Sequence, residues 1–450
     1  MIETGTTLIR MIHRNMHTRA SKCVFVIATM MICIGEGSLR GQVFLDSVLV
    51  GRRIDAIQIH GNQKTKASII LREMKSCEGD TLDEALLMED QKRIQNLNLF
   101  NRVTIFAQYQ DRRVIVHVHV TEQWYIFPYP IFFINERDWD KLSYGAGLKH
   151  FNFRGRAEIL DAFFWLGYNP SVQLDYINPW IGGRHHLSLR TNIYFQKVRS
   201  KHYRDEEVTE NHKGVYGILG KRFGYHTHLN MSLSYREVTF SPSDSGQTLS
   251  PDGRDRLPSL GLSLVWDHRD LIEYPHSGWY VYFSAVKTGV SSMTADYLFY
   301  GFDTRAYVPL GRTTLAFRLA SDVSHGKIPL YDRLYIGYNE RVRGHFFEAF
   351  EGENRALASA AFRIPLIPVR YVDLGDQSQM MNLKFGLSLG FFIDTGTVWF
   401  QSEGINDLKF QTGYGVGLHM HLPYINVLRF EMAFNQRGRK QFILDMGVDI

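Results

Sequence analysis

Apolar and polar residues alternate along most of this chain, from about residue 125 to residue 450. In one segment, Leu229, Met231, Leu233 and Tyr235 alternate with polar residues. Successive side chains of a strand point to opposite faces, so each segment predicts a strand with one apolar and one polar face. Segments of roughly ten such residues are typical of strands that have lipid on one side and water or protein on the other.

Sixteen segments follow this pattern, and closed outer-membrane barrels prefer an even number of strands. The fold class is therefore predicted to be mainly β, with a transmembrane β-barrel over residues 125–450. Arg190, Arg236 and Arg318 fall on polar faces, where their charge can be solvated. We predict strands near residues 125–135, 141–151, 157–168, 170–178, 185–196, 213–223, 228–238, 258–268, 278–288, 297–308, 313–323, 355–366, 381–395, 412–422, 426–435 and 440–450.

The first predicted strand contains two prolines, Pro128 and Pro130. Proline has no backbone N–H and cannot donate to a ladder, so central strands avoid it. If both prolines face the last strand, the seam that closes the barrel is short of hydrogen bonds and can open sideways. The alternative is that both belong to a linker and that the strand begins at Ile131.

Residues 52–123 predict a separate small α/β domain with the order β-α-α-β-β. A strand around Ile57 precedes a helix over about residues 65–75, and a capping box at residues 81–84 opens a second helix. Two further strands follow, around residues 103–109 and 114–120, where valines alternate with other residues.

The N-terminal 40 residues have the layout of a secretory signal, because the apolar stretch of residues 23–35 follows several basic residues. The alternative is an N-terminal membrane anchor. The mean hydropathy of −0.20 is too low for a bundle of membrane helices, and the 13% aromatic content suits interfacial girdles. The net charge of +5 includes no dense basic run with interleaved aromatics, so we expect no nucleic-acid partner.

Signatures of catalysis are absent from the sequence. It has no nucleophile elbow and no P-loop, and the glycines of residues 413–417 lie in a strand pattern rather than before a helix. We therefore expect no enzyme activity and no cofactor. Three His-x-His pairs could each present two ligands on one strand face, but the sequence places no third ligand beside any of them. We interpret them as ordinary strand residues and predict no metal site; the pairs are His117 and His119, His226 and His228, and His419 and His421.

Seven short motifs occur in a fixed order along the chain: residues 152–156 (NFRGR), 175–180 (DYINPW), 266–270 (WDHRD), 275–279 (PHSGW), 342–345 (VRGH), 392–396 (FIDTG) and 413–418 (GYGVGL). Together they make residues 52–450 similar to the BamA/TamA/Sam-type outer-membrane assembly family, also called the bacterial surface-antigen barrels. Residues 52–123 resemble a POTRA domain of that family. A β-barrel of about 16 strands behind one POTRA domain is the fold that this resemblance implies.

The resemblance also implies a functional pair inside the barrel. The loop motif Val342, Arg343, Gly344 and His345 would fold back into the lumen, and Arg343 would pair with Asp394. Asp394 belongs to the strand motif that also contains Phe392 and Gly396. Pairing would lower the cost of desolvating both charges. At the fourth loop position, His345 stands where the family usually has an aromatic residue.

The function implied is insertion and folding of β-barrel proteins in the outer membrane of a Gram-negative-type bacterium, with the POTRA domain in the periplasm. Its partners would be unfolded outer-membrane β-barrel proteins, outer-membrane lipids and accessory assembly proteins. A client would add as a strand to the edge of the POTRA sheet, which needs little side-chain specificity. Two alternatives stay open, a protein translocation pore and a surface-antigen barrel without insertase activity; for the POTRA domain alone, a further alternative is a structural spacer.

Overall fold

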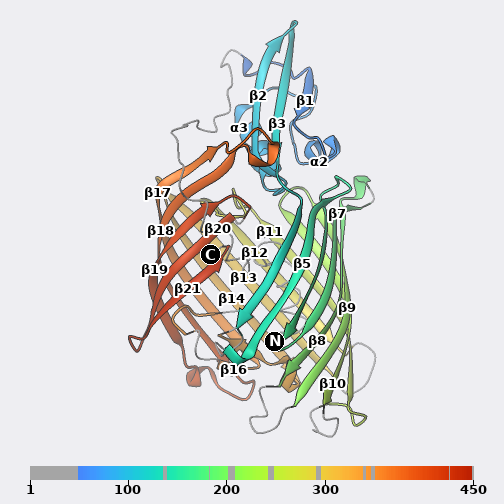
Figure 1. The fold of residues 1–450 in the computed structure, drawn as a ribbon, viewed down its shortest axis with the longest axis vertical. Coiled ribbons are helices and arrows are strands. Elements are labelled where there is room, and N and C mark those ends of the chain that lie inside the picture. Colours follow the sequence, from blue (N-terminus) through green and yellow to red (C-terminus); the bar gives the residue numbers. More distant parts are fainter. Residues whose placement is uncertain are drawn as a thin grey trace.

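A small α/β domain stands at one end of a β-barrel in the computed structural model (Figure 1). The structure describes residues 49–134, 139–181, 183–200, 208–241, 248–289, 295–337, 341–345, 350–424 and 426–447. The predicted secretory segment, residues 1–40, lies outside the described residues. Within the described ranges, no helix is both long and apolar enough to cross a membrane.

The small domain has the predicted order β-α-α-β-β. Its elements are β1 (Ala56–His60), α2 (Ala67–Leu71), α3 (Glu84–Gln95), β2 (Phe100–Gln110) and β3 (Arg113–Glu122). The sheet order is β1-β3-β2, with β1 parallel to β3. Helix α2 is shorter than predicted. The second helix begins one residue after Asp83, whose side chain accepts from the backbone N–H of Ala85, so Asp83 rather than Thr81 is the cap.

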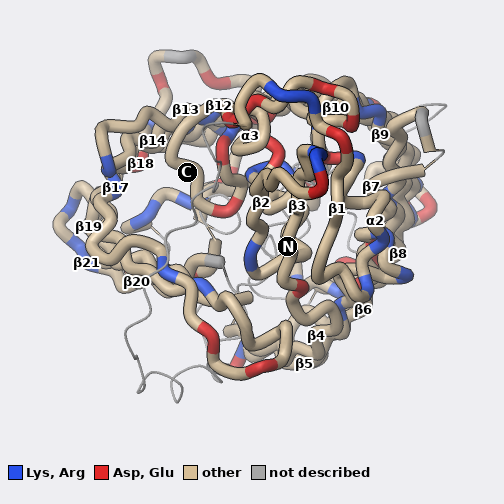
Figure 2. The backbone as a smooth tube through the Cα atoms, turned by 90° about the horizontal axis from the view of Figure 1, so that it is seen from above, with Lys and Arg blue, Asp and Glu red and all other residues tan. Residues whose placement is uncertain are grey.

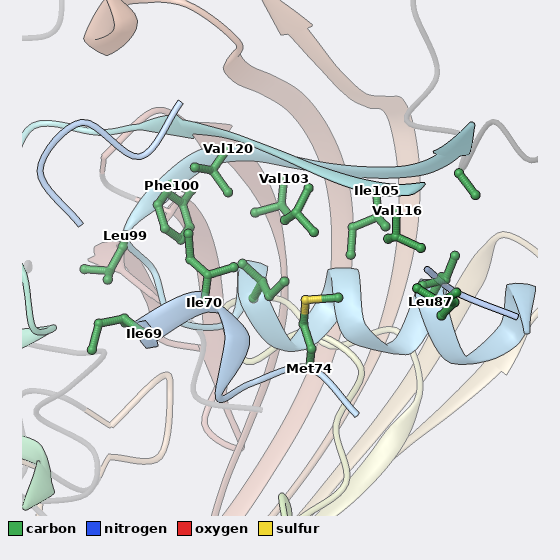
Figure 3. Close-up of a cluster of buried hydrophobic side chains, with 14 of the residues drawn as sticks. Ile69, Ile70, Met74, Leu87, Leu99, Phe100, Val103, Ile105, Val116 and Val120 are labelled. Carbon is green, nitrogen blue, oxygen red and sulfur yellow. The ribbon is translucent and has the colours of Figure 1, made fainter. Parts of the chain in front are cut away.

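One apolar core holds the small domain together. Strand β3 alternates, so that Val116 and Val118 point at the helices and are fully buried. Figure 3 shows these strands lying over α2 and α3, with Ile70, Met74 and Leu87 facing Ile105 and Val116. The period of two in the strands and the apolar face of each helix therefore meet in a single interior.

The barrel wall is one sheet of 16 antiparallel strands. Its order runs from β21 through β17 to β14 and then without interruption to β4. The strands are β4 (Ile126–Ile134), β5 (Leu142–Phe153), β6 (Glu158–Gly167), β7 (Ser171–Ile181), β8 (Leu187–Arg199), β9 (Thr209–Phe223), β10 (Thr227–Ser241), β11 (Arg254–Asp267), β12 (Gly278–Thr288), β13 (Tyr297–Leu310), β14 (Thr313–Gly326), β17 (Asn354–Val372), β18 (Leu383–Trp399), β19 (Gln411–Leu422), β20 (Asn426–Asn435) and β21 (Lys440–Met446).

Each of the 16 predicted strands corresponds to one strand of this sheet, which confirms the predicted fold class. Several strands are longer than predicted because they continue into polar loops, as β9 does. The sequence missed the short strands β15 (Leu334–Ile336) and β16 (Phe350–Gly352), which pair in the long connection from β14 to β17. Short 3-10 helices occupy Trp139–Lys141, Gly183–His185, Leu330–Asp332, Ser378–Met380 and Ile405–Asp407.

The two faces of the barrel wall differ as the alternation predicted. Leu233 and Leu262 are more than half exposed on the outer face. The inward-facing arginines are buried in ion pairs rather than solvated, which corrects the expectation made for Arg190, Arg236 and Arg318. Arg318, for example, lies 2.9 Å from a carboxylate oxygen of Asp303. These side chains are largely removed from solvent, so a charge there requires a partner.

Candidate functional site

Described residues of the connection between β14 and β17 contact two separate parts of the barrel wall. Near its start, Asp332 accepts a hydrogen bond from Arg236 of β10 at 2.7 Å and another from Tyr297 of β13. The neighbouring Tyr331 donates to Asp255 of β11 at 2.7 Å. These contacts attach the start of the loop to the wall made by β10, β11 and β13.

Arg343, further along the loop, is held by another part of the wall, strand β18. Its Nε lies 2.6 Å from one carboxylate oxygen of Asp394 on β18, and its Nη2 lies 2.7 Å from the other. The guanidinium carbon is 3.6 Å from the ring centroid of Phe392. Arg343 is 6% exposed and Asp394 is 2% exposed, so the contact is a buried bidentate pair. The residues suggested by the resemblance are therefore in contact.

A second carboxylate, Glu431 of β20, completes the arginine site. Its Oε1 accepts from Nη1 of Arg343 at 2.9 Å and lies 3.5 Å from Nη1 of Arg429. Arg429 in turn contacts Asp445 of β21 at 3.2 Å. Sequence reasoning missed Glu431, Arg429 and Asp445, because only the register of neighbouring strands brings them to the loop.

Two glycines allow the loop tip to lie against the wall. Gly344 has a φ of +99°, a conformation that glycine adopts without strain. Gly413 of β19 faces the loop, and a Cβ atom there would stand only 1.7 Å from the carbonyl oxygen of Arg343. His345 donates through Nε2–H to the carbonyl oxygen of Thr412 at 3.0 Å. The histidine thus uses a polar contact where the family usually has an aromatic residue.

Val342 and Gly396 belong to the same contact. Val342 is fully buried in a small cluster with Ala320, Ile336 and Leu357. Gly396 lies under this cluster, and a Cβ atom there would meet side chains of Leu357, Ile336 and Val342 at 2.8–3.0 Å. The loop motif and the strand motif therefore fit each other sterically as well as electrostatically.

The tip also reaches the last strand of the sheet. Nη2 of Arg341 lies 2.7 Å from a carboxylate oxygen of Asp445, and the backbone N–H of Gly344 donates to Gln441 at 3.2 Å. Both partners belong to β21. Together with Asp394, Thr412 and Glu431, these contacts connect the loop tip to four consecutive strands, β18 to β21.

Strands β4 and β21 stand at the two ends of the sheet order, and within the described residues no ladder joins them. Pro128 and Pro130 lie inside β4, in register with Leu148 and Ala146 of β5, so the linker interpretation is wrong. The carbonyl of Tyr125 accepts from Phe151 at 2.8 Å. Alternate residues of an antiparallel strand face the same neighbour, so the odd-numbered residues that follow Tyr125 direct their backbone groups to β5. Pro128 and Pro130 therefore direct their backbone groups away from β5, toward the side of β21.

The small domain is seated over one mouth of the barrel. Viewed from that end, β1, β2, β3 and α3 lie within the outline of the barrel strands (Figure 2). Glu73 forms a bidentate pair with Arg222 at 2.9 and 2.7 Å, and the hydroxyl of Tyr225 donates to the carbonyl oxygen of Met74 at 2.8 Å. A cavity of about 660 Å³ between domain and barrel is lined by charged residues of both, including Arg93 and Asp267.

The three His-x-His pairs have different surroundings. His226 stacks on His268 at 4.1 Å, and His419 contacts the hydroxyl of Tyr274 at 2.9 Å. The pair on β3, His117 and His119, is joined by a third histidine, His60, which sequence reasoning missed. The parallel pairing of β1 with β3 brings it there, a signal that the sequence carries only once that pairing is known.

Fold and site together define a 16-stranded β-barrel with an internal loop and one N-terminal POTRA domain. The chain belongs to the Omp85 superfamily, because the profile of the Omp85 superfamily domain matches residues 152–449. A POTRA profile, described as a surface antigen variable number repeat, matches residues 52–123. These matches confirm the resemblance to the BamA/TamA-type family.

Solved structures share this fold at low sequence identity. BamA from Haemophilus ducreyi lacking POTRA domains 1-3 is 18% identical, with a TM-score of 0.53 over 88% of this chain and 84% of that chain. CdiB from Escherichia coli is 14% identical, with a TM-score of 0.61 over 89% of this chain and 75% of that chain. CdiB from Acinetobacter baumannii is 15% identical, with a TM-score of 0.51 over 89% of this chain and 74% of that chain.

Proposed function

We propose that this protein inserts and folds β-barrel proteins in the outer membrane of a Gram-negative-type bacterium. The observation that carries this proposal is the attachment of the Arg343 loop to β18–β21, the end of the sheet that would close against β4. A loop fixed to the wall at this end can hold the last strands in place while the seam with β4 opens. In this proposal the loop keeps the last strands attached to the rest of the barrel while the seam is open.

The two prolines of β4 support a seam that separates easily. Pro128 and Pro130 cannot donate a hydrogen bond, and their backbone points to the side that β21 would occupy. A client strand could pair with the exposed edge of β21 or β4 and then leave laterally into lipid. Burial of the client in the membrane and closure of its own edges would drive the step, without a nucleotide, cofactor or catalytic reaction.

The POTRA domain would lie in the periplasm and receive clients. Its sheet has β1 and β2 as edge strands, and an extended segment of an unfolded outer-membrane protein can add to such an edge through main-chain hydrogen bonds. Accessory assembly proteins could dock on the same domain. Its position over the barrel mouth would then deliver the client close to the seam.

Reconstitution tests the proposal directly. The chain without its predicted secretory segment is placed in liposomes, an unfolded barrel protein is added, and the rate of client folding is measured against liposomes with an unrelated porin. We expect faster client folding that Arg343→Ala abolishes and Arg312→Ala, a change at an exposed turn arginine, preserves. No acceleration, with ion conductance intact, would favour the translocation pore instead. No acceleration and no conductance would favour a surface-antigen barrel.

Substitution of the two prolines tests whether the seam between β4 and β21 opens. Replacing Pro128 and Pro130 together by valine returns two N–H donors to the side of β4 that faces β21. We expect slower client folding and unchanged conductance, because the seam then forms more hydrogen bonds. Pro309→Val, at an exposed proline of β13 far from the seam, is the matched control. Equal client folding rates in both variants would show that the prolines have no part in opening.

A further inference from the structure

Three histidines gather on the outer face of the POTRA sheet, the face turned away from α2 and α3. His60 is the last residue of β1 and pairs in register with His119 of β3. His117 lies two residues earlier on β3 and therefore on the same face. The opposite face of β3 carries the buried valines, so the histidine cluster is separate from the hydrophobic core.

The ring nitrogens are close enough to share one ion. Nε2 of His60 lies 3.1 Å from Nδ1 of His117, and one ligand atom from each of the three rings lies within 4.8 Å of the others. Zinc–nitrogen bonds of about 2.0–2.1 Å in a tetrahedral site place neighbouring ligand nitrogens about 3.3 Å apart. One edge of the required triangle is thus present, and His119, which is exposed, can rotate to close the other two.

The central ring is held in place before any ion binds. His117 is 8% exposed and stacks against Phe106 of β2 with ring centroids 5.0 Å apart. Its Nε2 is buried and has no hydrogen-bond partner among the described residues. The proton of His117 can therefore reside on Nε2, and Nδ1 then accepts a hydrogen bond from Nε2–H of His60. An ion can replace that proton between the two nitrogens once the proton of His60 moves to its Nδ1.

We propose that His60, His117 and His119 form a binding site for a divalent transition metal ion, with zinc as the best-suited ion. Three imidazole ligands suit zinc, copper and nickel, whereas calcium and magnesium prefer oxygen ligands. The exposed position of His119 leaves the fourth coordination position open to water or to a donor from a partner. This site is independent of the proposed insertion function.

A bound ion would join the edge strand to the centre of the sheet. Strand β1 pairs with β3 over five residues, from Ala56 to His60, and the site lies at the end of that ladder. An ion that binds the folded sheet and not the unfolded chain stabilises the fold by mass action. The expected structural effect is therefore slower opening of β1 when zinc is present.

Metal titration of the full chain tests the site. The protein, purified in detergent without a histidine tag, is dialysed against zinc chloride, and bound metal is measured by elemental analysis and by competition with a chromophoric chelator. We expect one zinc ion per chain. Loss of groups that only orient a ligand typically costs about 10–100-fold in metal affinity, so His60→Ala or His119→Ala should cost at least as much.

The controls separate this site from nonspecific binding. His325→Ala removes an exposed histidine at the other end of the barrel and should leave the affinity unchanged. His119→Ala is the decisive variant, because His119 is exposed and its loss leaves the stacked pair of His117 and Phe106 intact. Zinc bound with equal affinity and stoichiometry by the His119→Ala chain, or no zinc bound by the unaltered chain, would overturn the proposal.

Discussion

The POTRA domain and the barrel use the same alternation of side chains and bury opposite faces. In β3, Val116 and Val118 are fully buried, whereas His119 on the other face is exposed. In the barrel, Leu233 and Leu262 face outward, and Arg355 and Arg429 are among the most buried large side chains of the described chain. The comparison teaches that alternation reveals the two faces of a sheet, and that only the surroundings decide which face is the interior.

The two interiors are consequently stabilised by different forces. The POTRA core excludes water from apolar surface, and a smaller side chain there leaves a cavity. The barrel lumen buries charges, and each charge must find a partner because desolvation is costly. Loss of one lumen residue removes a partner from a buried charge, whereas loss of an apolar residue on the lipid face leaves neither a cavity nor a charge.

The largest effect is expected from Asp394→Ala. The change leaves Arg343 with Glu431 as its remaining acidic partner, and breaking a buried ion pair costs about 3–5 kcal/mol. Urea unfolding in lipid vesicles, followed by the shift in gel mobility of the folded barrel, measures the free energy of unfolding. Asp376→Ala, at an exposed aspartate, is the control and should change it little.

A double-mutant cycle sharpens this result. If the pair acts as a unit, Arg343→Ala combined with Asp394→Ala should cost less than the two single changes added together. Additive costs would mean that the two residues stabilise the barrel independently of each other and do not act as a pair.

A smaller difference is expected between two leucines. Leu87→Ala in the POTRA core should cost about 3–5 kcal/mol, because transfer and cavity costs add. Leu262→Ala on the outer face of the barrel should cost about 2 kcal/mol or less, since lipid can fill the vacated space. Unfolding of each domain, monitored by hydrogen exchange of its own strands in vesicles, gives the two values. Equal costs would contradict the role assigned to the cavity.

The sequence alone was sufficient to predict the positions of the wall strands, but not the contacts between side chains inside the lumen. Alternation over ten or more residues located all 16 wall strands, whereas the three-residue strands β15 and β16 are too short to show a period. Arg343 and Asp394 could be paired only through family resemblance. Glu431 and Gly413 meet the loop because of strand register and the path of the loop, which local pattern does not contain. The same holds for His60, whose partners follow from parallel pairing.

The smallest effect concerns the junction of the two regions, where an ionic contact adds to the packing of Phe151 and Ala157 against the POTRA core. Glu73→Gln keeps the size of the side chain and removes its charge from two hydrogen bonds with Arg222, so we expect a loss of about 1–2 kcal/mol at the junction. Glu73 also accepts from Nε of Arg72 in its own domain at 3.3 Å, but it lies outside the apolar cluster, so the POTRA core should keep its stability.

Hydrogen exchange in vesicles should therefore be faster at residues 72–77 and unchanged in β3 and β18. Glu84→Gln, at an exposed position of α3, is the matched control. Faster exchange throughout the POTRA core would mean that the domain depends on the barrel for its fold. Faster exchange confined to the junction would mean that the contact between Glu73 and Arg222 can break while both domains stay folded. The POTRA domain could then leave the barrel mouth without unfolding.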